Sequence, residues 1–194
     1  MFIQTEETPN PATLKFLPGR VVLPQGTRDF RDVTAASASP LASRLFALPG
    51  VNGVLLGQDF IAVSKAPGQD WPVVKPAVLG AIMDHFVSGA PVLHDVASPE
   101  AAPGTDLDDA IVKQIKALLD YKIRPAVAQD GGDIVFDRFE EGIVFLHLQG
   151  ACAGCPSSSA TLKAGVENML RHYIPEVKEV RQSNGMEASH GGCA

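Results

Sequence analysis

The sequence predicts an α+β fold in two small domains, each a short sheet packed against two helices. Three observations favour it. The chain has 194 residues, which is room for one large domain or two small ones. Residues 97–106 are small and proline-containing, as expected of a linker, and separate two regions of periodic apolar residues. Both regions alternate short strand-type runs with longer helix-type runs. We therefore expect domains at 1–96 and 107–182, followed by a flexible tail at 183–194.

The second half is expected to fold in the order helix, strand, strand, helix, strand. Its first helix begins near Asp106, has apolar residues on one face, and should end at Arg124-Pro125. Pro156 is placed as the first residue of the second helix, where its missing N–H costs nothing, and Pro175 ends that helix. The expected strands are 134–138, 143–149 and 177–181.

The first half also alternates strand-type and helix-type runs, with weaker periodicity. Ser39 is a suitable N-cap for a short helix over 40–47, and a longer helix is expected over 70–87. The expected strands are 2–5, 14–16, 51–56 and 60–64, the last two forming a hairpin.

Composition excludes several classes of function. The chain has 16 basic and 22 acidic residues, a net charge of −6 and a pI near 5.3, so a large basic surface for nucleic acid is not expected. No apolar run reaches the roughly 18 residues of a membrane span. At 45% hydrophobic residues, the chain has enough apolar material for a core.

The cysteine count and the first residues bear on the compartment. Three cysteines are too few, and odd in number, for a disulfide-stapled secreted fold. The N-terminal residues show no secretory signal and no Arg-rich transit segment. We expect a reducing, cytoplasmic location in a bacterium. The mitochondrial matrix is the alternative if a transit segment was removed.

Cys152 and Cys155 are the candidate functional residues. They form a C-x-x-C pair between an expected strand and an expected helix. Backbone N–H groups at a helix start favour thiolate over thiol, and Gly150 and Gly154 let the backbone approach something bulky. A structural zinc site is not favoured, because it needs four Cys or His ligands. The spacing alone leaves a redox dithiol and an iron–sulfur cluster shared between two chains equally open.

Other polar residues have simpler interpretations. Asp130, Asp133 and Asp137 are expected to be turn and strand-edge residues rather than metal ligands. Four histidines without ligand spacing are expected to be satisfied or solvated: His85, His94, His147 and His172.

Two motifs resemble one family of proteins. Residues 150–158, preceded by Ile123-Arg124-Pro125 and 130–134, resemble the NifU C-terminal-type domain of the Nfu iron–sulfur carriers. Residues 8–19 resemble the domain that precedes it in Nfu proteins. By this resemblance, 1–96 is an Nfu N-terminal-type domain and 107–182 is the cluster-binding domain.

The resemblance implies a function without enzymatic activity. A 4Fe-4S cluster would be held between two subunits by Cys152 and Cys155, as cofactor and metal ligands, so that the chain is a homodimer when it binds the cluster. Its other partners would be an upstream cluster-assembly scaffold and apo iron–sulfur client proteins, with no nucleic acid and no membrane. The family pattern does not include Cys193. The alternative function is a thiol–disulfide oxidoreductase that uses the same two cysteines.

Overall fold

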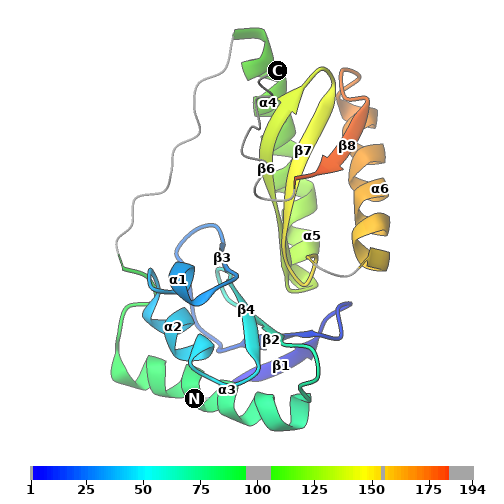
Figure 1. Ribbon diagram of the computed structural model, residues 1–194. Helices are drawn as coiled ribbons and strands as arrows, with labels where there is room; N and C mark the ends of the chain where they lie inside the picture. Colours follow the sequence, from blue (N-terminus) through cyan, green and yellow to red (C-terminus); the bar gives the residue numbers. More distant parts are fainter. Residues whose placement is uncertain (1, 95–105, 154–155, 184–194) are drawn as a thin grey trace, which may run out of the picture.

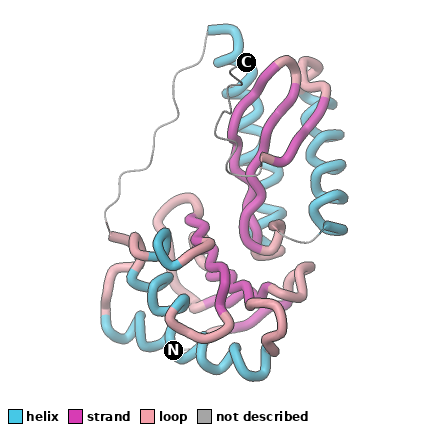
Figure 2. The backbone as a smooth tube through the Cα atoms, in the orientation of Figure 1, coloured by secondary structure: helices cyan, strands magenta, loops and turns pink. Residues whose placement is uncertain are grey.

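The computed structural model describes residues 2–94, 106–153 and 156–183, and it has the expected α+β architecture in two modules (Figures 1 and 2). The N-terminal module contains one antiparallel sheet with the strand order β1-β2-β5-β4-β3. Its strands are β1 (Gln4–Glu7), β2 (Thr13–Leu17), β3 (Arg28–Phe30), β4 (Val51–Leu56) and β5 (Ile61–Lys65). Its helices are α1 (Val33–Ala36), α2 (Pro40–Phe46) and α3 (Trp71–Ser88).

The core of this module lies between one face of the sheet and the helices. Alternate strand residues such as Phe16 and Ile61 are fully buried there with Leu41 of α2 and Ile82 of α3. Ser39 caps α2 as predicted, because its hydroxyl accepts the Ala42 N–H at 3.0 Å. The residues between them in the strands point to the opposite face of the sheet, which carries no helix of this module.

The C-terminal module is a three-stranded sheet with the order β6-β7-β8, in which β6 and β7 are antiparallel and β7 and β8 are parallel. Glu141 and Gly142 connect β6 to β7 with φ values of 51° and 87°, as in the two-residue turns that suit hairpin twist. The strands are β6 (Gly132–Glu140), β7 (Ile143–Gly150) and β8 (Glu179–Gln182). The helical segments are α4 (Asp106–Leu118), η1 (Leu119–Ile123), α5 (Arg124–Gln129) and α6 (Pro156–Tyr173).

The prediction that Arg124-Pro125 ends the first helix of this module is wrong. The chain continues through η1, a π-helical turn, into α5. Pro125 stands in the first turn of α5, where a proline removes no required N–H, and the wider turn before it accommodates the interruption of the hydrogen-bond ladder. As a result, Arg124 is directed from a helix rather than from a loop.

Smaller differences also have local causes. The sequence signals missed β3 and α1, which are three and four residues long and too short for a periodic pattern. Tyr173, the last residue of α6, is 50% exposed. The predicted linker, 97–106, lies outside the described residues except for Asp106, and the predicted tail is described only at Ser183. Within the described residues, no helix is long and apolar enough to cross a membrane.

Candidate functional site

The cysteine loop follows directly from the end of β7. Gly150, the last strand residue, has a φ of +59°, a conformation that favours glycine. The loop then folds back on the turn before β6, since the Ala151 N–H donates to the Gly131 carbonyl oxygen at 3.1 Å. A second bond, from the Ala153 N–H to the Gly150 oxygen at 3.0 Å, closes a tight turn around Cys152.

Cys152 is buried, with 7% of its surface exposed. Its sulfur lies against Gly132, and a Cβ at that position would overlap with the sulfur, so a glycine is required there. Burial, reinforced by the negative charges of Asp130 and Asp133, raises the pKa of Cys152 to about 12. The expectation that the helix start favours a thiolate is therefore wrong for Cys152, because its surroundings favour the thiol. Cys155 lies outside the described residues.

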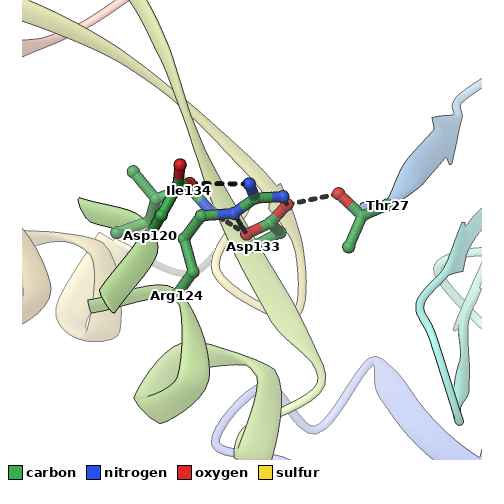
Figure 3. A network of polar contacts seen from close by, with 5 residues as sticks. All are labelled: Thr27, Asp120, Arg124, Asp133 and Ile134. Carbon is green, nitrogen blue, oxygen red and sulfur yellow. Dashed lines mark hydrogen bonds and ion pairs between the residues drawn. The ribbon is translucent and has the colours of Figure 1, made fainter. Parts of the chain in front are cut away.

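Asp133 organises the turn beside the cysteine loop (Figure 3). Its carboxylate is 2% exposed and accepts two bonds from Arg124, from Nε at 2.9 Å and from Nη2 at 2.7 Å. It also accepts the Ile134 N–H at 2.8 Å and the hydroxyl of Thr27. The hydrogen bonds from Arg124 to Asp133, followed by its contact with Asp120, raise the pKa of Arg124. This ion pair ties the start of α5 to the start of β6.

The N-terminal module donates hydrogen bonds to the residues around the cysteine loop. Besides Thr27, three of its side chains reach backbone oxygens of the other module. The bonds are Asn10 Nδ2 to Ala153 O at 3.2 Å, Lys15 Nζ to Gln129 O at 3.2 Å, and Arg31 Nη2 to Leu148 O at 2.7 Å. The surroundings of the cysteine loop are thus built from both modules.

The sequence analysis did not identify these four donor side chains as neighbours of the cysteine loop. Asn10 stands within the motif by which the N-terminal half resembles its family, but nothing in one sequence indicates what it contacts. Asp133 was expected to be a turn or strand-edge residue, whereas it is a buried ion-pair partner. Asp130 does stand in the turn before β6 and Asp137 in β6, paired with Arg138. Within the described residues no three of His, Cys, Asp and Glu gather to hold a metal.

The histidines only partly follow their predicted role. His94 and His172 are exposed, and Nδ1 of His147 lies 3.2 Å from the Ser183 oxygen. His85 is the exception, because it is completely buried in α3 and neither ring nitrogen has a hydrogen-bond partner among the residues that the structure describes.

Comparison with known families and proteins assigns both modules. Residues 3–89 match the family "Scaffold protein Nfu/NifU N terminal", and residues 115–181 match the "NifU-like domain" family. Proteins of Drosophila erecta and Drosophila ananassae, both named "NFU1 iron-sulfur cluster scaffold homolog, mitochondrial", are 54% identical over 183 and 188 residues. Each match covers 94% of this chain and spans 65% and 64% of those relatives.

A solved structure, a NifU-like protein from Saccharomyces cerevisiae, aligns with 50% of this chain and 87% of its own at 24% identity, with a TM-score of 0.45. The relatives' names contradict the expected cytoplasmic location, because both are called mitochondrial. The two domain matches, in this order and with these relatives, confirm the family resemblance of the sequence. The chain belongs to the Nfu family, in which an Nfu/NifU N-terminal domain precedes a NifU-like domain.

Proposed function

We propose that this chain is a carrier of iron–sulfur clusters and not an enzyme. Two subunits would share one 4Fe-4S cluster through Cys152 and Cys155 of each. The cluster would arrive from an upstream assembly scaffold and pass to apo-proteins. The names of the relatives, which are iron–sulfur cluster scaffold homologues, support the general role and favour the mitochondrial alternative for its location.

The observation that carries the proposal is the position of Cys152 in the NifU-like domain. It lies in a tight turn that follows the end of β7, closed by the bond from the Ala153 N–H to the Gly150 oxygen, and the second cysteine of the motif is three positions further on. Iron–sulfur clusters are held by thiolates, normally four. A chain that supplies two from this loop needs a second chain to complete the set.

The raised pKa of Cys152 counts against this cysteine as the nucleophile of the alternative function. A thiol–disulfide oxidoreductase needs a cysteine that ionises easily, because the thiolate is the nucleophile. A pKa raised to about 12 leaves Cys152 almost wholly protonated at neutral pH. An iron centre would displace that proton when it binds the sulfur, since metal binding and thiol ionisation are coupled.

Anaerobic reconstitution with iron and sulfide tests the proposal. Native mass spectrometry should detect a dimer with a single 4Fe-4S mass. Cys152→Ser and Cys155→Ser should each lose the cluster and the dimer, while Cys193→Ser, the matched control, should keep both. A monomer that retains a complete cluster contradicts shared ligation, and a colourless protein that reduces insulin disulfides supports the oxidoreductase instead.

A further inference from the structure

The face of the N-terminal sheet that has no helix is covered by the other module of the same chain. One straight row of paired residues crosses all five strands on this face: Glu6, Lys15, Ala62, Leu55 and Asp29. We call these five residues the docking row. Leu55 and Ala62 in its centre are each 1% exposed, and with Phe60 they pack against Ala128 of α5.

Charged side chains at both ends of the docking row are directed across the interface. Lys15 pairs with Glu6 at 3.2 Å and also donates to the Gln129 carbonyl. Asp29 pairs with Arg31 at 2.6 Å, and Arg31 donates to the Leu148 carbonyl. Each carboxylate thus holds a cation of the N-terminal module in position to bind a backbone oxygen of the C-terminal module.

Two glycines of the C-terminal module fit against the centre of the row. A Cβ on Gly150 would lie 2.5 Å from Leu55 Cδ2, and a Cβ on Gly131 would lie 3.0 Å from Thr8 and 3.7 Å from Ala62. Both have positive φ, at 59° and 72°. The absence of side chains at these positions lets the cysteine-loop end of the module lie directly on the sheet.

The hydrogen bonds described above across this interface run in one direction. Asn10, Lys15, Thr27 and Arg31 donate, and the acceptors are the Asp133 carboxylate and three backbone oxygens. The acceptors belong to the end of α5, the start of β6 and the segment that runs from the end of β7 into the cysteine loop. The N-terminal sheet thus presents hydrogen-bond donors around an apolar centre. These donors bind mainly backbone oxygens of the C-terminal module, so the sheet recognises the backbone of that module rather than its side chains.

We propose that the docking row and its four donors form a docking surface for the cysteine-loop end of the NifU-like module, occupied by the chain's own module when no cluster is bound. A cluster shared between two chains requires a second cysteine loop at the same place. The closed arrangement and the cluster-bridged dimer therefore exclude one another, a consequence that rests on the proposed function. Cluster uptake is then slowed by the fraction of molecules that are closed.

The docking is tested first without any cluster. A reporter thiol, Ala153→Cys, is placed in the full chain with Cys152, Cys155 and Cys193 changed to Ala, and its rate of labelling by a maleimide is measured. Ala153 is partly buried in a groove that Asn10 and Arg31 also line. Asn10→Asp keeps the oxygen that caps the Ala12 N–H at 3.0 Å but replaces the donor to the Ala153 oxygen with a second carboxylate oxygen.

Labelling should be about tenfold faster with Asn10→Asp, and faster also with Arg31→Ala, because lost bonds of this kind shift an equilibrium by that order. The matched controls, Gln4→Glu and Arg20→Ala, change the same charges at exposed positions of the N-terminal module, where Arg20 lies over the Phe86 ring of that module, and should label at the parent rate. Far-UV circular dichroism verifies that each variant is folded. Equal rates in all four variants overturn the docking.

The second arm uses the chain with its native cysteines. Asn10→Asp and Arg31→Ala should take up the cluster faster than the parent chain during anaerobic reconstitution, and the two controls should not. Faster labelling with unchanged uptake overturns the competition with a second copy. If even the parent chain takes up no cluster, the proposed function fails, while the labelling arm still decides the docking.

Discussion

Arg124 binds two carboxylates at nearly equal distances, and burial should decide which of them matters. Asp133 is bound at 2.7 Å and is 2% exposed, whereas Asp120 is bound at 2.9 Å and is 62% exposed. Breaking a buried ion pair costs about 3–5 kcal/mol. We expect Asp133→Asn to fall near 3 kcal/mol, the low end of that range, because the Arg124 side chain keeps 29% of its exposure. Exposed pairs contribute about 0–1 kcal/mol, so Asp120→Asn should cost less than 1 kcal/mol.

Urea unfolding followed by far-UV circular dichroism measures both variants. The single tryptophan, Trp71, lies in the N-terminal module, so its fluorescence reports that module separately and should change little in either variant. The free energy of unfolding follows from the midpoint and slope of the C-terminal transition. Equal losses for Asp120→Asn and Asp133→Asn would refute the reasoning, because hydrogen-bond distance rather than burial would then set the energy.

Three further predictions concern other parts of the chain. Burial and the nearby charge of Arg44 lower the pKa of His85 below its usual 6.5. Below pH 6.5 the unfolded chain therefore binds a proton at His85 more readily than the folded chain does, and the free energy of unfolding should fall as the pH drops. Tryptophan fluorescence in urea measures this fall, and a His85→Phe variant should lack it. Gly150→Ala should destabilise the C-terminal module by at least 1–2 kcal/mol, about the cost of a left-handed alanine, and a urea midpoint equal to the parent's would contradict the strain. A fragment that begins near Pro99 should unfold cooperatively in urea, since the buried cluster around Ile134 and Leu170 is formed within the C-terminal module alone; loss of cooperativity would show that the two modules need each other to fold.

The sequence predicted the elements best where one local pattern decides the structure. Ser39 is an N-cap and Pro40 is a favoured first helical residue, and α2 begins at Pro40 as expected. The strand predicted at 51–56 is β4 with the same bounds. Pro156 begins α6 for the same kind of local reason. Caps, prolines and alternation act over a few residues, so a single sequence contains the information that they need.

The prediction was wrong where two local rules compete. A proline after a helical run normally ends it, because the residue before proline avoids the helical region. Here Arg124 stays helical, and the π-turn over 119–123 absorbs the misfit. The compensating interaction is an ion pair, because the continued helix places Arg124 beside the buried Asp133, nine positions later in the sequence. Helix propensity alone cannot weigh a contact of that kind.

The surroundings of Cys152 could not be predicted because they depend on how two modules meet. The motif identified the two cysteines and the glycines around them. The expected helix start favoured a lowered thiol pKa. The structure buries that thiol beside two carboxylates and raises its pKa to about 12 instead. The two effects oppose each other, and the magnitude of desolvation depends on which atoms cover the sulfur. Those atoms come from Gly132, twenty positions away in the sequence, and the loop they support is bound by Asn10, 143 positions before Ala153. A pairing over such distances leaves no periodic or compositional trace in one sequence, so only the three-dimensional arrangement connects the N-terminal motif to the cysteine loop.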